Sequence, residues 1–205
     1  MEKILSDQWS VSIPNDDLIG MASVINPRHG DMSYRGVFLD PGQTRKIRNT
    51  YLVGSDGIIL TVLTIHHEQT KQIEHMPEKG VIVPIHVLPE QRCDGMVEIS
   101  GNPDGAMRIA FPNGEIRYTM AVVAEYHDWR STANGCASGD HVTNIATRVN
   151  LASLRKLLIC AEFMTGNDRE SLGIGRLMYA RSPGIGYYIK FSLSERMDFY
   201  GVVSV

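Results

Sequence analysis

The sequence predicts a mainly β protein of the α+β class: an antiparallel β-sandwich or barrel-like sheet with one C-terminal amphipathic helix followed by a β-meander. From Trp9 to Tyr126, short runs of β-branched and aromatic residues alternate with clusters of Gly, Pro, Asn or Asp, which is typical of strands joined by tight turns. After Val142, leucines recur at helical spacing. With 205 residues, 43% of them hydrophobic, we expect a single β-rich domain over residues 1–205.

The N-terminal half contains the first expected strands. Residues 33–39 form a β-prone run that ends in an Asp-Pro-Gly sequence, and residues 47–53 and 58–66 are separated by Gly-Ser-Asp-Gly. Because Gly and Asp close tight turns, the last two runs are predicted to form a hairpin.

Four further runs continue the strand pattern, at residues 81–87, 96–100, 106–111 and 115–126. Asn113 and Gly114 predict a two-residue hairpin loop of the primed type between the last two. Pro84 has no backbone N–H to donate, so its strand is expected at a sheet edge or at a bulge.

A helix is predicted over residues 150–165, with Asn150 as its N-cap and Gly166 at its C-terminal end. Its leucine stripe is expected to pack on a sheet. Three more strands, at residues 174–181, 187–193 and 198–203, would finish the sheet as a meander. Residues 131–140 are interpreted as a long loop within the domain.

Composition narrows the function classes. The formal net charge is −3, which disfavours a diffuse electrostatic nucleic-acid binder. Cys93, Cys136 and Cys160 are widely spaced and form no C-x-x-C pair, and we find neither a signal peptide nor a transmembrane segment. These features favour a reducing compartment, so we expect a cytoplasmic, intracellular protein.

Most catalytic templates are missing. There is no phosphate-binding G-x-x-x-x-G-K-[ST] loop, and the glycines at 173 and 175 lack the third glycine of a dinucleotide fingerprint. Residues 135–139 have the outer glycines of a nucleophile elbow, but Ala137 stands at its centre. We therefore expect no cofactor and a non-enzymatic protein.

One enzymatic alternative stays open in the segment 126–141. A Cys–His acyl-transfer site needs a thiol and an imidazole, with a carboxylate to orient them. Cys136 and His141 supply the first two groups, and Asp128 or Asp140 supplies the third. Under this alternative the protein is a small hydrolase or transferase.

A metal site is a further alternative. His66, His67 and His75 carry imidazoles that suit Zn, Cu or Ni, provided that the chain between them folds back. The main interpretation is no metal, with these histidines at a strand end and in an exposed loop.

A third alternative is a single-stranded nucleic-acid binding protein. Arg45, Lys46 and Arg48 form the densest basic cluster, and Arg28 lies nearby in sequence. Strand alternation would place Arg45 on the face opposite Lys46 and Arg48, which weakens this hypothesis.

The leading hypothesis is a structural or assembly protein that works through its surface. Ten methionines and an excess of arginine over lysine suit self-association or protein–protein interaction. We expect a homo-oligomer or a protein partner, and a viral matrix-, coat- or movement-type protein is one concrete form of this hypothesis. Nucleic acid and a peripheral membrane contact stay open as partners.

Overall fold

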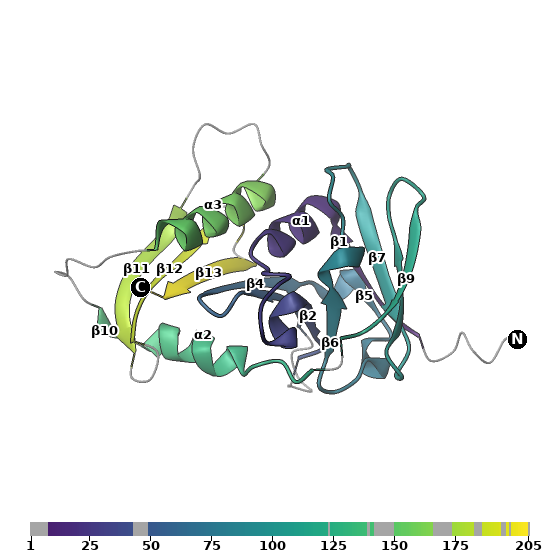
Figure 1. Cartoon of the computed structure of the whole chain (residues 1–205), viewed down its shortest axis with the longest axis horizontal. Helices are drawn as coiled ribbons and strands as arrows, with labels where there is room; N and C mark the ends of the chain where they lie inside the picture. Colours follow the sequence, from purple (N-terminus) through teal and green to yellow (C-terminus); the bar gives the residue numbers. More distant parts are fainter. Residues whose placement is uncertain are drawn as a thin grey trace, which may run out of the picture.

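The computed structural model describes residues 8–42, 49–122, 124–138, 140–141, 150–165, 174–182, 186–193, 196 and 198–204. Its described strands form two antiparallel sheets, and helices cover both faces of the larger one (Figure 1). The predicted mainly β, α+β class is therefore confirmed. Within the described part of the chain, no helix combines the length and the apolar character that a membrane span requires.

The smaller sheet has five strands in the order β5 (Thr70–Lys71), β1 (Trp9–Pro14), β7 (Met96–Gly101), β8 (Ala106–Ala110) and β9 (Ile116–Met120). The larger has eight, in the order β10 (Asp140–His141), β11 (Ile174–Ser182), β12 (Gly186–Leu193), β13 (Phe199–Ser204), β4 (Ile59–Ile65), β3 (Thr50–Ser55), β2 (Gly36–Asp40) and β6 (Val81–Pro84). The α-helices are α1 (Asn15–Ser23), α2 (Trp129–Ser138) and α3 (Leu151–Thr165). Short 3-10 helices lie at Met32–Arg35, His67–Gln69, Ile73–His75 and Ile85–Val87.

The order of elements repeats along the chain, although the residues do not. A strand, a helix and a three-stranded meander follow one another in β1-α1-β2-β3-β4 and again in β10-α3-β11-β12-β13. Between them, β6 and β7-β8-β9 are connected through the 3-10 helix at Ile85–Val87 in place of an α-helix. The first of these units runs from β1 to β4 and the second from β6 to β9. The first strand of each unit pairs within the sheet of the other unit, because β1 pairs with β7 and β6 pairs with β2.

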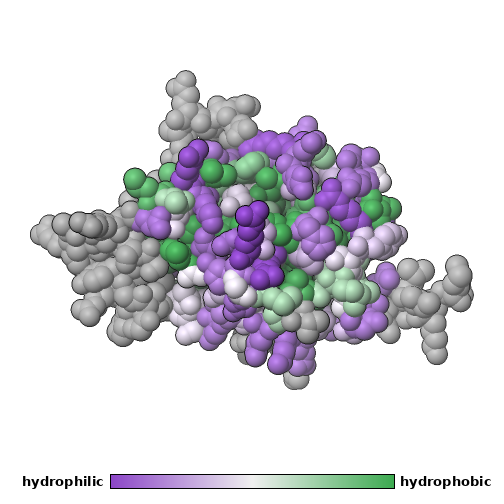
Figure 2. All heavy atoms as spheres, viewed as in Figure 1, coloured by the Kyte–Doolittle hydropathy of each residue, from purple (hydrophilic) through white to green (hydrophobic). Residues whose placement is uncertain are grey.

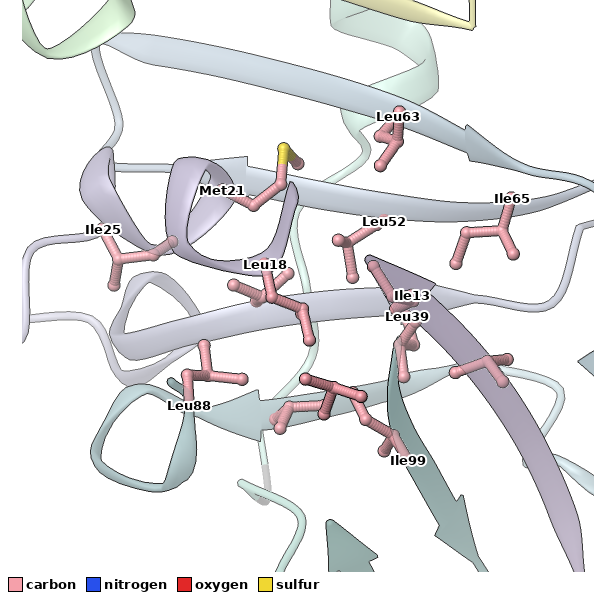
Figure 3. Packing of buried hydrophobic residues seen from close by; sticks show 14 of the residues in the cluster. Ile13, Leu18, Met21, Ile25, Leu39, Leu52, Leu63, Ile65, Leu88 and Ile99 are labelled. Carbon is pink, nitrogen blue, oxygen red and sulfur yellow. The ribbon is translucent and has the colours of Figure 1, made fainter. Parts of the chain in front are cut away.

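The main core lies between the sheets and beneath α1 and α3 (Figure 3). Alternate residues of β1 point into it, which gives the strand its regular buried and half-buried pattern. Leu18 and Met21 of α1 belong to this core. A Cβ atom on Gly20 would lie 2.9 Å from the Cβ of Phe163, so a glycine is needed where these two helices touch.

A partly buried ion-pair network joins the same two helices to the residues just before β13. The Arg196 guanidinium donates to Asp17 at 2.8 and 2.9 Å, to Asp198 at 3.0 and 3.1 Å, and to the carbonyl of Met164 at 2.9 Å. Burial raises the pKa of Asp17, and the guanidinium acts in the opposite direction. The network therefore carries a desolvation cost that the bidentate geometry offsets.

Several predicted elements are confirmed. The hairpin of β3 and β4 forms with Leu52 opposite Leu63, and the meander β11-β12-β13 follows the helix. The Asn150 side chain caps α3 by accepting from the backbone N–H of Ala152 at 3.0 Å. Pro84 ends β6, which is an edge strand of the larger sheet, as a residue without an N–H requires.

Two helices were not predicted, and the loop expected at residues 131–140 is wrong. Those residues belong mainly to α2, and β10 follows. Residues such as Ser131, Thr132 and Gly135 favour helix weakly, so the stability of α2 comes from the burial of Trp129 and Ala133 against the larger sheet. Helix α1 lacks a clear polar face, because six of its nine residues are buried.

The turn between β8 and β9 also differs from the prediction. Gly114 has a positive φ of 87°, but Asn113 does not. The Gly114 N–H donates to the Phe111 carbonyl at 3.0 Å, and the Phe111 N–H donates to the Glu115 carbonyl at 2.9 Å. The loop therefore has three residues and ends in a left-handed glycine, whereas both primed two-residue turns need a positive φ at the first central residue, Asn113. The strand after it ends at Met120, short of residue 126.

Candidate interaction site

A groove of about 710 Å³ opens where the chain leaves β9 and returns to the larger sheet as residues 121–130. One wall comes from that segment, and the other comes from β2, β6 and the turn at residues 103–105. We call it the acidic groove, and its lining includes Asp31, Glu78, Asp104, Tyr126, Asp128 and Trp129.

Backbone hydrogen bonds set the position of the groove wall. The Ala121 N–H donates to the Gly105 carbonyl at 2.8 Å, and the Val122 N–H donates to the Ile82 carbonyl at 3.0 Å. The second bond covers part of the outer edge of β6, which would otherwise present unpaired backbone groups. Residues 124–128 have no regular secondary structure, and α2 begins at Trp129.

Asp40, at the end of β2, anchors the start of α2. Its side chain is 4% exposed, and it accepts hydrogen bonds from Trp129 Nε1 at 2.8 Å and from Arg130 Nη2 at 2.6 Å. The Arg130 guanidinium also lies 4.7 Å from the Trp129 ring and 5.6 Å from the Tyr51 ring. One end of the groove is therefore held by a buried, charge-assisted network.

Aromatic rings form the floor. Tyr126 stacks on Phe38 with ring centroids 4.4 Å apart and planes 9° apart. His127 lies 4.5 Å from Tyr126 and 5.0 Å from Tyr34, measured between ring centroids. Rings stacked in this way are rigid and offer faces or edges to a ligand.

Two polar atoms of this cluster have unused hydrogen-bonding capacity. The Tyr126 hydroxyl and Nδ1 of His127 are buried without a hydrogen-bond partner among the described residues. Burial raises the pKa of Tyr126 and lowers the pKa of His127. At neutral pH the site therefore presents a protonated phenol and an uncharged imidazole, and such unpaired buried groups cost about 1–3 kcal/mol each.

The rim of the groove is acidic. Six carboxylates and two basic side chains line it, and both basic groups are used: Lys79 pairs with Glu125 and Arg130 with Asp40. Among the described residues, the other four carboxylates have no basic partner. These four are Asp31, Glu78, Asp104 and Asp128. Hydrogen bonds from Ser33 lower the pKa of Asp31, which keeps it ionised at neutral pH.

A second unpartnered surface lies on β9, the edge strand of the smaller sheet. Ile116, Tyr118 and Met120 are 45%, 75% and 59% exposed, and the alternation of a strand puts all three on one face. We call this row the β9 edge. An exposed edge strand with large apolar side chains is a template for pairing with another chain.

On the face shown in Figure 2, hydrophilic side chains are interspersed with small hydrophobic areas. The β9 edge combines three large apolar side chains with the free side of an edge strand.

The candidate catalytic residues are placed as follows. Asp128 is exposed, and its Oδ1 accepts from the Ser131 N–H at 3.0 Å, so it caps α2. Cys136 belongs to α2, and Asp140 and His141 form β10, but the side chains of these three lie outside the described part. The Cys–His site thus stays a prediction, and Asp128 has a structural role that explains its presence.

The candidate metal ligands do not converge. His66 and His67 are exposed after β4, and His75 lies in a 3-10 helix. Within the described residues, no group of three His, Cys, Asp or Glu side chains is arranged to hold a metal ion.

Of the candidate nucleic-acid contacts, Arg45, Lys46 and Arg48 lie outside the described residues. Arg28 is exposed in the turn after α1, where its backbone N–H donates to Asn26 Oδ1. The basic cluster therefore stays a prediction.

A scan of protein-family models found no match, and a search of curated proteins found no similar sequence. Solved structures do match. The Caulobacter crescentus polymerase III β protein has a TM-score of 0.58 at 11% identity, and covers 97% of this chain and 66% of its own. The fold is similar to that of DNA sliding clamps.

Two further sliding clamps have a similar fold. The Helicobacter pylori β clamp has a TM-score of 0.60 at 11% identity, over 96% of this chain and 65% of its own. The Pseudomonas aeruginosa DNA polymerase sliding clamp has a TM-score of 0.56 at 13% identity, over 95% and 66%. At these identities the likeness concerns the fold alone, and the chain spans just under two thirds of these clamps' length. It gives the matrix-, coat- or movement-type hypothesis no support.

Proposed function

We propose that this chain is a non-enzymatic, clamp-type scaffold, in which several copies close around DNA and hold a partner protein there. The fold likeness carries this proposal, because it extends over 95–97% of the chain in the clamps compared above. A fold alone does not determine function, so the surfaces must supply the remaining argument.

Assembly is assigned to the β9 edge. Among the described strands, only β8 pairs with β9, so the outward side of β9 is open for pairing. Pairing with a strand of a second copy would satisfy those backbone groups and cover Ile116, Tyr118 and Met120. Such head-to-tail contacts make a ring when the rotation between copies closes.

Charge suggests how DNA would be held. The net charge is −3, and two basic groups near α1 and α3 already have acidic partners: Arg92 pairs with Asp16, and Lys156 with Asp56. Strong phosphate binding requires several free Lys or Arg side chains. A ring would therefore retain DNA by surrounding it, with little grip on the backbone.

Light scattering after size-exclusion chromatography tests the assembly. The wild-type chain is expected at a multiple of its 22.8 kDa mass, and Tyr118→Lys should shift it to the monomer, because a desolvated charge opposes strand pairing. Leu151→Lys is the matched control, since Leu151 is an equally exposed apolar residue on α3, at 77%. A wild-type monomer at every concentration, or assembly unaffected by Tyr118→Lys, contradicts the proposal.

Retention on DNA tests the encircling mode. Dilute chain is mixed with nicked circular plasmid, concentrated so that rings close, and passed over a sizing column at high salt. We expect co-elution that disappears when the plasmid is linearised, because a closed ring slides off a free end. Equal retention on both forms would indicate phosphate binding instead.

A further inference from the structure

We propose that the acidic groove binds an extended, Lys- or Arg-containing segment of a partner protein. This inference rests on the proposed scaffold function and names the chemistry of its partner. It concerns a different surface from the β9 edge, so the two can be tested separately.

The first argument is charge complementarity. Asp31, Glu78, Asp104 and Asp128 come from four separate loops and turns, yet all four line one groove without a basic partner among the described residues. A basic segment would supply that missing charge and would associate faster at low salt. A nucleic-acid strand would be repelled by the same carboxylates.

The second argument is the unused hydrogen-bonding capacity of the floor. Tyr126 lines the groove, and its hydroxyl is buried and has no hydrogen-bond partner among the described residues. A carbonyl of a docked main chain is an acceptor of the required kind. Because residues 124–128 lack regular secondary structure, a small shift of this segment brings the hydroxyl to the ligand.

The third argument is shape. The groove of about 710 Å³ is open to solvent and is lined in part by β6, whose outer edge is bridged by Val122 alone among the described residues. An extended segment could lie along this edge, and the stacked rings of Phe38 and Tyr126 offer apolar and cation–π contacts to the stems and heads of Lys or Arg.

The test is selection from a random 12-residue peptide library displayed on phage, with the full chain as bait. We expect enrichment of peptides carrying Lys or Arg. The affinity of an enriched, fluorescein-labelled peptide is then measured by anisotropy for wild type and for a groove variant with Asp31→Asn, Glu78→Gln, Asp104→Asn and Asp128→Asn. The Asn residues keep the capping hydrogen bonds of Asp31 and Asp128.

A control variant removes four exposed carboxylates outside the groove, through Glu68→Gln, Glu90→Gln, Asp94→Asn and Glu162→Gln. Both variants change the net charge equally. The groove variant should lose about tenfold or more in affinity, and the control less than about twofold. The wild-type affinity should weaken with added salt.

Failure is recognisable. The inference is overturned if the library gives no enrichment, if the enriched peptides lack basic residues, or if they bind the groove variant as tightly as wild type. Binding lost in Tyr118→Lys but kept in the groove variant would assign the peptides to the β9 edge, with the same consequence. Light scattering of the wild-type chain separates the two proposals: a wild type that does not assemble refutes the scaffold, whereas an assembled wild type that binds no basic peptide refutes the groove alone.

Discussion

The β9 edge and the acidic groove are both open to solvent, but their chemistry is opposite. The edge presents Ile116, Tyr118 and Met120 next to the free side of a strand. The groove presents carboxylates around a floor of stacked rings and of polar atoms without a partner among the described residues. An apolar edge suits a permanent contact, and a charged groove suits an exchangeable, salt-dependent one. In the proposed scaffold, assembly and recruitment would therefore use separate surfaces.

The largest expected effect comes from removing the wall of the groove. Trp129 is 5% exposed, and its ring N–H is bonded to Asp40. Trp129→Ala should lower the free energy of unfolding by about 3–5 kcal/mol, measured by urea denaturation, while Trp129→Phe keeps most of the buried ring and should cost less. A loss below about 1 kcal/mol for Trp129→Ala would mean that α2 does not dock on the sheet.

A smaller loss of stability is expected when the pH is lowered, through His127 in the groove. Burial lowers the pKa of His127 below its unfolded value, so the unfolded chain binds a proton more readily than the folded one. The folded state should therefore lose stability as pH falls below about 6.5. Parallel urea titrations at pH 7 and pH 5 should show a greater loss for wild type than for His127→Gln. Identical losses in both proteins would show that the imidazole is not buried.

The smallest effect is expected from Tyr126→Phe. The ring keeps its stack on Phe38, and the change removes only a buried hydroxyl without a partner. The free energy of unfolding should stay constant or rise by about 1 kcal/mol, while the affinity for a selected basic peptide falls. A clear loss of stability would reveal a hydrogen bond to that hydroxyl in the free protein.

Local patterns predicted much of the fold. The β3–β4 hairpin and α3 carry their own turn and capping residues, so short stretches such as Asn150 and the leucines after it were sufficient. Helix α1 has no such signal, since Asp17 and Asn15 are buried beside its apolar residues. Residues 1–205 as a single domain and a cytoplasmic location stay predictions.

The two candidate surfaces were harder to predict from the sequence than the fold was. Asp31 and Asp128 are almost a hundred positions apart, and only the packing of residues 121–130 against β6 brings them to one groove. At the β9 edge a signal did exist, because Ile116, Tyr118 and Met120 alternate with polar residues. Alternation alone does not say that the apolar face is the exposed one; the structure places Arg117 and Thr119 on the opposite, half-buried face.

Electron microscopy of the concentrated wild-type protein is the most direct test of a clamp-type assembly. Negatively stained particles should average to closed rings with a central opening, and Tyr118→Lys should abolish them. Isolated monomers, or open filaments whose subunits never close, would contradict the account.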